Sequence, residues 1–347
     1  MTPADSLRER LSLIPQAPYP HHSRLHALKS FSTPHTAVYI KREDELGFGI
    51  AGSKIRKYRS LIPHLLSQGI EEVLVIGSAY SNHVLGISQL LIENSLNPTL
   101  FLRGDPDRVL KGNAFLTTLL VGKDSIHWFS KSQWSMVHEC VKNYAQKTPQ
   151  RCFILPEGAH LPESLPGALS LPLDIIHNEK ENNLSFDHLF IDSGTGLTAI
   201  ALILAYQWLG KKSMIHVFLM AEDEDYFLKQ LTAFHSHFQR LMQTFDLPLP
   251  TRFQLHKPLR APRFGQMHSL LFQDIIKLAR TEGFLTDPLY TGKLFHEAQR
   301  LIQDQELKGQ ILIVHSGGAL TLMGFEEQLK SAFLSLYPDS KGSAEGQ

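Results

Sequence analysis

A lysine at the expected start of a helix is the first candidate for chemistry in this sequence. Lys54 follows the small residues Gly52 and Ser53, and apolar residues recur on one helical face over residues 54–68. The positive end of a helix dipole lowers the proton affinity of an amine placed there, and such an amine can attack an aldehyde. Taken alone, the segment fits a solvated first-turn lysine better, so the hypothesis depends on the other motifs of the chain.

A glycine-containing loop after an apolar segment is the second candidate. A strand is expected at residues 189–192, and six residues that could hold an anion follow it: Ser193, Gly194, Thr195, Gly196, Leu197 and Thr198. Glycines let backbone amides approach a phosphate, and a helix N-terminus supplies free N–H groups. The loop lacks the three-glycine dinucleotide pattern and the Gly-Lys-Ser/Thr ending of nucleotide-binding loops, so a small monophosphate fits better than NAD or ATP. An ordinary tight turn uses glycine in the same way, and the loop alone does not decide between the two.

Lys57 lies one helical turn beyond Lys54. Residues three apart share a helical face, so both amines can reach one ligand. The alternative for Lys57 is a surface lysine.

The pattern of apolar segments indicates the elements that must position these residues. Nine short segments are predicted to be strands, at residues 37–41, 73–77, 99–103, 126–129, 153–155, 189–192, 215–220, 253–256 and 311–315. Most are continuous apolar runs with helical segments between them, which is typical of parallel strands covered on both faces. The sequence therefore predicts an α/β fold with doubly wound, mostly parallel sheets, in two domains or one large unit.

The remaining segments receive simpler predictions. Residues 1–36 are expected to hold one short helix that caps the larger domain, and residues 156–172 a return crossing between domains. Residues 178–183 are polar and predict an exposed turn, and residues 340–347 predict a frayed end. The apolar run at 197–209 is too short to span a bilayer and predicts a buried helix.

Composition argues against several classes of function. The 34 Lys and Arg residues balance the 34 Asp and Glu residues, so there is no electrostatic basis for binding nucleic acid or a membrane. Cys140 and Cys152 form no disulfide or metal pattern, and the first residues show no signal peptide, which together fit a cytoplasmic protein. The 18 histidines show no metal-ligand spacing, and the pairs His21–His22 and His235/His237 are expected on the surface.

Three motifs together resemble a known family. They are Lys-Arg-Glu-Asp at residues 41–44, Gly-Ser-Lys-x-Arg-Lys at residues 52–57 and Ser-Asn-His at residues 81–83. The combination resembles the pyridoxal-phosphate enzymes of the tryptophan synthase β class, also called fold type II. Within that class it is most similar to the D-cysteine desulfhydrase and 1-aminocyclopropane-1-carboxylate deaminase family. The resemblance extends to about residue 329 and so covers most of the chain.

The resemblance implies pyridoxal 5'-phosphate as cofactor. Lys54 would hold it covalently, Lys57 and the loop 193–198 would bind its phosphate, and Asn82 would bond its phenolic oxygen. Ser316, in the segment Ile-Leu-Ile-Val-His-Ser-Gly-Gly, would face the pyridine nitrogen. A hydroxyl at that place cannot stabilise a protonated pyridinium as a carboxylate would.

The resemblance also implies a small amino acid as substrate. Ser81, a good helix N-cap by itself, would receive the substrate carboxylate and take part in proton transfer. Tyr290 would lie near the reacting carbon, although it also fits a tyrosine packed under a loop. The catalytic residues would thus be Lys54, Ser81 and Tyr290, and the residues that line the substrate site would be Tyr80, Ser81, Asn82, His83, Phe264 and Tyr290. The family further implies a homodimer, with a small domain at residues 59–165 inserted into a large domain made of residues 1–58 and 166–347.

Several positions depart from the family pattern. Ser53 replaces an asparagine, Tyr80 a glutamine, Leu85 an arginine and Phe264 a tyrosine, and Gly158-Ala159-His160 replaces Gly-Gly-Ser. These changes leave the cofactor chemistry intact and put the substrate in doubt.

Three positions separate the two activities of the family. Deaminases follow the catalytic tyrosine with glutamate where this chain has Thr291, follow Ser-Asn with glutamine where it has His83, and keep the tyrosine that Phe264 replaces. The sequence therefore predicts a D-cysteine desulfhydrase, which releases pyruvate, sulfide and ammonia by β-elimination. The alternatives are a 1-aminocyclopropane-1-carboxylate deaminase and a non-catalytic relative that binds the cofactor or an amino acid.

Overall fold

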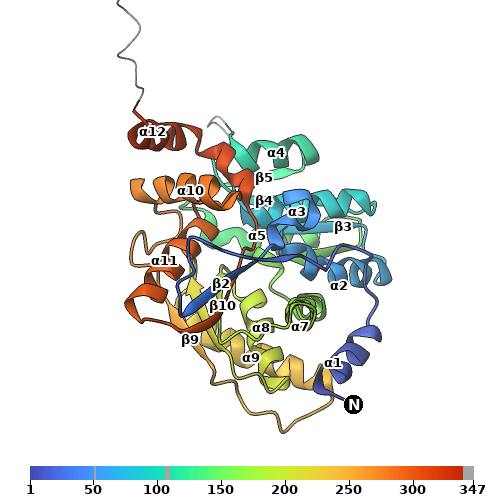
Figure 1. Ribbon diagram of the computed structural model, residues 1–347. Coiled ribbons are helices and arrows are strands. Elements are labelled where there is room, and N and C mark those ends of the chain that lie inside the picture. The colour runs from blue at the N-terminus through green and yellow to red at the C-terminus, as the bar shows by residue number, and fades with distance from the viewer. Residues whose placement is uncertain (51, 106–109, 339–347) are drawn as a thin grey trace, which may run out of the picture.

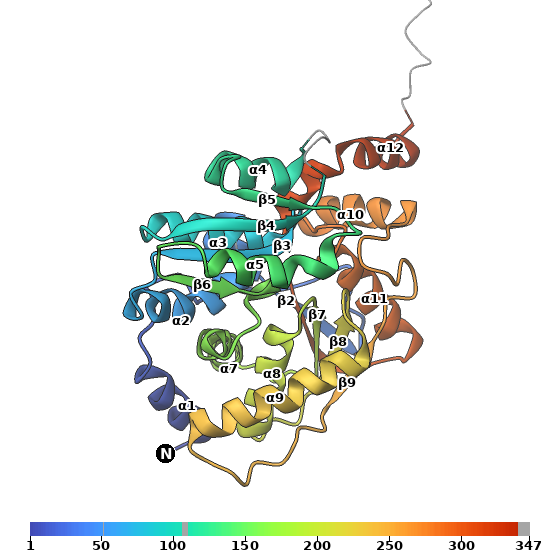
Figure 2. The same ribbon diagram turned by 180° about the vertical axis from the view of Figure 1, so that it is seen from behind.

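The computed structural model describes residues 1–50, 52–105 and 110–338. Within them the chain forms two β-sheets, each with helices on both faces (Figures 1 and 2). Ala51, which precedes Gly52, and residues 340–347, predicted to fray, lie outside the described residues.

The larger sheet contains six strands in the order β1-β2-β10-β7-β8-β9. Their bounds are β1 Leu25–Ala27, β2 Thr36–Lys41, β7 His188–Ser193, β8 Met214–Leu219, β9 Phe253–His256 and β10 Gly309–Val314. Neighbouring strands are parallel except β1, which pairs antiparallel with β2 at the edge. Strand β1 was not predicted, because three residues are too few to show a periodicity.

The smaller sheet contains four parallel strands in the order β5-β4-β3-β6. Their bounds are β3 Glu72–Ser78, β4 Asn97–Arg103, β5 Ile126–Phe129 and β6 Cys152–Leu155. All four lie within residues 59–165, the predicted small domain. The exact division of the chain into domains stays a prediction.

Twelve α-helices in the described residues surround the sheets. They are α1 Pro3–Ser12, α2 Lys54–Ser67, α3 Asn82–Glu93, α4 Gly112–Val121, α5 Val137–Ala145, α6 Leu165–Ala168, α7 Ser170–Asn182, α8 Leu197–Trp208, α9 Glu224–Met242, α10 Ser269–Glu282, α11 Thr291–Asp304 and α12 Glu326–Leu336. Helix α2 begins at Lys54 as predicted, and α8 matches the predicted buried helix, with most of its side chains in the core of the larger sheet.

Alternate residues of a strand enter different cores, which is why the strands read as continuous apolar runs. Val73 and Val75 of β3 pack with residues of α2 and α3, whereas Leu74 and Ile76 pack with residues of α5 on the other face. In the larger sheet Ile191 of β7 packs in the core beside α8 and Phe190 in the core beside α11. The predicted α/β architecture with doubly wound, mostly parallel sheets is therefore confirmed.

Two local predictions are wrong. Residues 178–182 belong to the end of α7 rather than to an exposed turn, and Asn178 and Glu179 are buried there. The reason is tertiary: the Asn178 side chain accepts a hydrogen bond from the buried Lys41 ammonium, and the Glu179 carboxylate accepts one from the Phe186 amide. His235, predicted on the surface, lies on the buried face of α9 and is 7% exposed.

A buried ionic cluster joins the first turn of α2 to β2 and α7. We use this name for Lys41, Glu43, Arg56 and Asp174. The Arg56 guanidinium donates to Glu43 at 2.8 Å and to Asp174 at 2.7 Å, and the Lys41 ammonium donates to Asp174 as well. Arg56 and Lys41 are both 0% exposed, so each charge is removed from water but satisfied by a partner.

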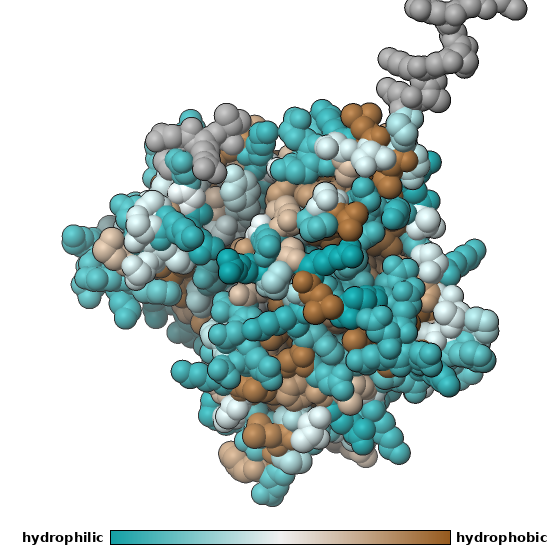
Figure 3. Space-filling view, turned by 90° about the vertical axis from the view of Figure 1, so that its left-hand side faces the viewer, coloured by the Kyte–Doolittle hydropathy of each residue, from teal (hydrophilic) through white to brown (hydrophobic). Residues whose placement is uncertain are grey.

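The surface agrees with the balanced composition. The face in Figure 3 is mostly hydrophilic, with hydrophobic side chains in separate small patches. None of the helices in residues 1–50, 52–105 and 110–338 is long and apolar enough to cross a membrane.

Candidate active site

A cavity of about 460 Å³ opens between the two sheets, where β3, β7 and β10 end. In parallel α/β sheets this carboxyl edge is where ligands bind. All fifteen site residues named from the sequence line the cavity: Lys54, Lys57, Tyr80, Ser81, Asn82, His83, Ser193, Gly194, Thr195, Gly196, Leu197, Thr198, Phe264, Tyr290 and Ser316. The structure thus brings the predicted residues together, while their individual roles stay predictions.

The backbone before Lys54 is held against the segment that follows β10. The Ser53 amide donates to the Ser316 carbonyl at 3.0 Å. Gly52 has φ +53°, and a Cβ there would lie 2.3 Å from the same carbonyl oxygen, so only glycine allows this approach. The backbone that leads into Lys54 is therefore held against Ser316, and both residues line the cavity.

The Lys54 amine is set up to act as a nucleophile. Burial lowers the pKa of Lys54, and the carboxylates of Asp192 and Asp287 only partly oppose this effect. The amine lies 5.8 Å from the centre of the Tyr290 ring. A lysine with a lowered pKa is more often uncharged at neutral pH, which is the form that attacks an aldehyde.

The loop between β7 and α8 forms a cradle for an anion. The first N–H groups of α8 have no partners within the helix, and they face the cavity at the positive end of its dipole. Gly196 has φ +100°, which favours glycine, and a Cβ on Gly194 would lie 3.3 Å from the Tyr290 ring, so a larger residue there would require the ring to shift slightly. The Ser193 hydroxyl is buried and, within the described part of the chain, makes no hydrogen bond.

Lys57 adds an incompletely paired cation to this cradle. Its ammonium donates to the Gly158 carbonyl at 3.1 Å. Burial, followed by the charge of Lys54, lowers the pKa of Lys57 to about 7. An anion bound here would restore the favourable charged state.

Asn82, the first residue of α3, has a fixed amide orientation. Its Oδ1 accepts from Asn113 at 2.7 Å and from the Thr321 hydroxyl at 2.9 Å. Its amide NH₂ group is thereby left as the donor toward a ligand oxygen. Asn113 and Thr321 were missed in the sequence, because they belong to segments distant along the chain and carry no motif.

Ser81 and His83 are engaged with protein groups. The Ser81 hydroxyl caps α3 by accepting from the His83 and Val84 amides at 3.1 and 3.3 Å, which confirms the cap suggested by the sequence. The Tyr58 hydroxyl pairs with His83 Nδ1 at 2.8 Å. Burial, with Lys57 and Lys54 nearby, holds the pKa of His83 well below its usual range, so this imidazole is neutral.

Tyr290 and Phe264 form one wall of the cavity. The Asp287 carboxylate accepts hydrogen bonds from the amides of Leu289 and Tyr290, both at 2.8 Å, and thereby fixes the turn that presents the phenol. Burial and the negative charge of Asp287 raise the pKa of Tyr290, so the phenol stays protonated. Phe264 lies 5.8 Å from the Tyr290 ring, is 39% exposed and stands at the mouth.

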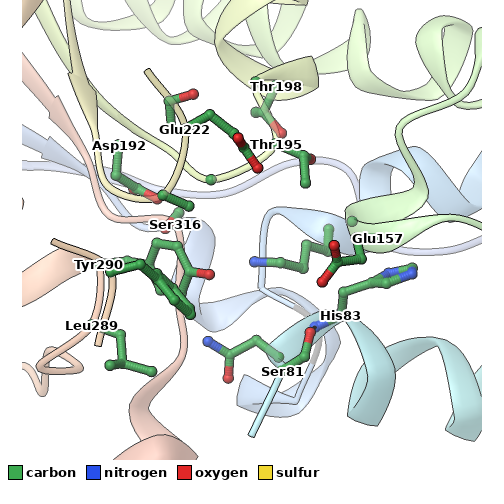
Figure 4. Close-up of a pocket in the computed structure, with 18 of the residues that line it drawn as sticks. Ser81, His83, Glu157, Asp192, Thr195, Thr198, Glu222, Leu289, Tyr290 and Ser316 are labelled. Carbon is green, nitrogen blue, oxygen red and sulfur yellow. Dashed lines mark hydrogen bonds between the residues drawn. The ribbon is translucent and has the colours of Figure 1, made fainter. Parts of the chain in front are cut away.

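Three acidic residues of the cavity were not predicted: Glu157, Asp192 and Glu222 (Figure 4). Burial raises the pKa of Asp192 to about 6, although Ser316 and Lys54 oppose the shift. Burial also raises the pKa of Glu157 and of Glu222. A charged residue at the end of an apolar strand was a usable signal for Asp192, whereas the other two carry no comparable signal.

These groups match the parts of pyridoxal 5'-phosphate. The cavity offers an activated amine for its aldehyde, an anion cradle for its phosphate and an oriented amide for its phenolic oxygen. The buried, unbonded Ser193 hydroxyl and the incompletely paired Lys57 ammonium are donors that a phosphate would satisfy. The residues present therefore fit this cofactor.

Comparison with known proteins supports the same assignment. The chain is 27% identical over 315 residues to the bifunctional, mitochondrial D-cysteine desulfhydrase/1-aminocyclopropane-1-carboxylate deaminase of Arabidopsis thaliana, covering 85% of this chain and 76% of the relative. It is 24% identical over 304 residues to the D-cysteine desulfhydrase of Serratia proteamaculans, covering 84% and 89%. A crystal structure described as an ACC deaminase homologue superimposes with a TM-score of 0.82 at 24% identity, covering 94% of this chain and 99% of that one. No family model matches the chain. The predicted resemblance is confirmed, since proteins of both names are homologues of this chain.

Proposed function

We propose that this protein is a pyridoxal 5'-phosphate-dependent lyase, and specifically a D-cysteine desulfhydrase. Its homologues and fold neighbours are lyases and deaminases that depend on this cofactor, so at the general level the chain is a pyridoxal-phosphate enzyme of amino-acid chemistry. The observation that carries the proposal is the position of Lys54, whose amine with lowered pKa enters the same cavity as the anion cradle at residues 193–198.

The bound cofactor would withdraw electrons from the bonds at the α-carbon of the amino acid. Lys54 would hold the cofactor covalently, release it to the substrate amine and then take the α-proton. The hydroxyl and the amides around Ser81, at the positive end of the α3 dipole, would receive the substrate carboxylate. Tyr290 would act as a proton donor, because its raised pKa keeps the phenol protonated.

β-Elimination from D-cysteine needs little more than these groups. The α-proton would pass to Lys54, the electron pair of that bond would form the Cα–Cβ double bond, and the sulfur would leave as hydrosulfide with the electrons of the carbon–sulfur bond. The remaining enamine is hydrolysed to pyruvate and ammonia. Opening a cyclopropane ring is harder, because no thiolate leaves and a ring carbon must be attacked or protonated.

The alternative substrate, 1-aminocyclopropane-1-carboxylate, is less well supported by the cavity wall. Phe264 offers no hydroxyl there. The Thr291 hydroxyl, at the place of the deaminase glutamate, is buried and donates to Asp287 at 2.8 Å. The other alternative, a non-catalytic amino-acid binder, is motivated by the same substitutions.

A comparison of two substrates tests the proposal. Protein loaded with pyridoxal phosphate should release sulfide and pyruvate from D-cysteine, with little or no 2-oxobutyrate from 1-aminocyclopropane-1-carboxylate. The K54A variant serves as the control for turnover by free cofactor. Comparable kcat/KM values for the two substrates would contradict the desulfhydrase assignment, and binding of either substrate without turnover would favour the non-catalytic alternative.

Three related expectations remain proposals. A homodimer is expected from the family, and light scattering after gel filtration tests it. If residues 59–165 form a separate inserted domain, their backbone amides should exchange with solvent as a cooperative unit distinct from the rest of the chain, which hydrogen-exchange mass spectrometry tests. The proposed cytoplasmic location rests on the two unpatterned cysteines of this chain, whereas the Arabidopsis relative is named as mitochondrial.

A further inference from the structure

Asp192 is a buried acid that the proposed function leaves without a role. It ends β7 and lines the cavity, where one oxygen of its carboxylate is buried and has no hydrogen-bond partner among the described residues. An unsatisfied acceptor of this kind is costly, so its presence calls for a ligand donor. Figure 4 shows the carboxylate beside Ser316 and directed into the cavity.

Asp192 and Ser316 occupy the same place because their strands are neighbours. Strands β7 and β10 are parallel, with Phe190 opposite Ile313, so both strands end at the same edge of the sheet. The Ser316 hydroxyl acts on the Asp192 carboxylate as a hydrogen-bond donor and favours its ionised form. The pair therefore presents a hydroxyl and a carboxylate together.

The covalent structure of the cofactor indicates which of its atoms Asp192 and Ser316 can contact. The ring nitrogen is para to the carbon that bears the aldehyde, and the phosphate arm is attached beside that carbon. With the aldehyde at Lys54 and the phosphate at residues 193–198, the nitrogen edge is directed away from Lys54. In Figure 4, Asp192 and Ser316 lie together on one side of the cavity, across from Glu157 and His83.

We propose that Asp192, together with Ser316, receives the N–H of a protonated cofactor ring nitrogen. The proposal rests on the proposed function. With Ser316 alone, the ring nitrogen is expected to be unprotonated. With Asp192 beside it, the nitrogen is expected to be protonated, because an anionic acceptor stabilises a pyridinium and a neutral hydroxyl does not. The carboxylate comes from β7, whereas the deaminases place theirs after the catalytic tyrosine, where this chain has Thr291.

Other titratable groups face Asp192 from two places, helix α2, which carries Lys54 and Lys57, and the turn before α11. Lys54 on α2 favours its ionised form, and Asp287, before α11, opposes it. The Tyr290 phenol is neutral because its pKa is raised. Asp192 could thus also serve as the counter-ion of Lys54, and the experiment must separate this role from contact with the ring nitrogen.

The test uses cofactor labelled with ¹⁵N at the ring nitrogen, bound to the full-length protein. The ¹⁵N chemical shift reports directly whether this nitrogen carries a proton. We expect the protonated value at neutral pH in the wild type and in S316A, and a move toward the unprotonated value in D192N. The dissociation constant of the cofactor should rise about tenfold or more in D192N, as expected for loss of a hydrogen bond to a charged group.

Two outcomes would overturn the proposal. One is an unprotonated ring nitrogen in the wild type, which needs no variant to be informative. The other is an unchanged shift in D192N, which would assign Asp192 to Lys54 instead. Borohydride reduction and peptide mapping of Lys54 in the same samples show whether the cofactor is in place, so failure of the proposed function is distinguishable from failure of this inference.

Discussion

Two groups of charged residues lie on opposite sides of the first turn of α2 and differ in how they are paired. The ionic cluster contains Arg56, whose guanidinium is bonded to Glu43 and Asp174. The cavity side contains Lys54 and Lys57, whose pKa values are lowered because burial is not balanced by a partner. Neighbouring residues of one helix thus have opposite electrostatic environments.

This difference in pairing separates the charges that stabilise the fold from those that are available to bind a ligand. A buried charge with excellent partners is tolerated, and removing one partner is strongly destabilising. A buried charge without a partner lowers stability, and such groups concentrate at functional sites. The same reasoning that assigns Lys54 to chemistry assigns Arg56 to structure, although the Gly-Ser-Lys-x-Arg-Lys motif contains both.

The largest effect is expected on the cavity side. K54A should lower turnover of D-cysteine by about 10²–10⁴-fold, the usual contribution of a positioned acid or base, and more if covalent attachment is essential. It should also abolish the adduct that borohydride traps on this lysine. Steady-state kinetics and peptide mapping measure both. A trapped adduct on another lysine would refute the assignment.

The next effect concerns the ionic cluster. R56M should lower the free energy of unfolding by about 3–5 kcal/mol, because the buried Glu43 would lose its ion-pair partner and Asp174 would keep only Lys41 as a buried cationic partner. K57M is the matched control one residue away, and it should leave cofactor-free protein as stable or more stable. Urea denaturation of both variants checks the pair. Equal losses would mean that the two sides of α2 do not differ as proposed.

A smaller effect is expected in the pH dependence of stability. The pKa of Lys57 falls from 10.5 to about 7 on folding, so between these pH values the unfolded chain binds more protons. The free energy of unfolding of cofactor-free protein should therefore rise with pH over this range, by up to about 1.4 kcal/mol per pH unit from this group. K57M should reduce the slope, and so should pyridoxal phosphate, because its phosphate would pair with the ammonium. An unchanged slope in K57M would show that Lys57 is paired after all.

The smallest effect is expected at Ser316. S316A removes the weaker of the two acceptors proposed for the ring N–H, at a cost of about 1 kcal/mol, so the dissociation constant of the cofactor should rise about fivefold. Fluorescence titration measures this change. A loss as large as that expected for D192N would make the hydroxyl, rather than the carboxylate, the main partner of the ring nitrogen.

The sequence predicted the fold well because its signals were local. Short apolar segments, most of them continuous, marked the nine predicted strands, and Lys54 marked the start of α2. The failures came from contacts between distant segments. Asn178 read as part of a polar turn, because nothing near it in sequence reveals that Lys41 is buried against it.

The site was predicted by motif rather than by physical chemistry. Every residue that the resemblance assigned to the site lines the cavity, whereas Asp192, Glu157 and Glu222 were missed because motif matching ignores residues that depart from the family. Asn113 and Thr321 were missed for another reason. They orient Asn82 from α4 and from the segment after β10, and only the folded chain brings them together.

The contact between Gly52 and Ser316 has a consequence for how the protein is made. The carbonyl of Ser316 contacts the backbone before Lys54. Lys54 follows β2 along the chain and Ser316 follows β10, so the site is completed by segments that lie far apart in sequence although their strands pair in the larger sheet. During synthesis, Lys54 leaves the ribosome long before its partner exists. The smaller sheet, whose strands are close together along the chain, can form in this interval, whereas the site must wait for β10. A nascent chain that stops before β10 should therefore carry the reactive lysine without a place to hold the cofactor.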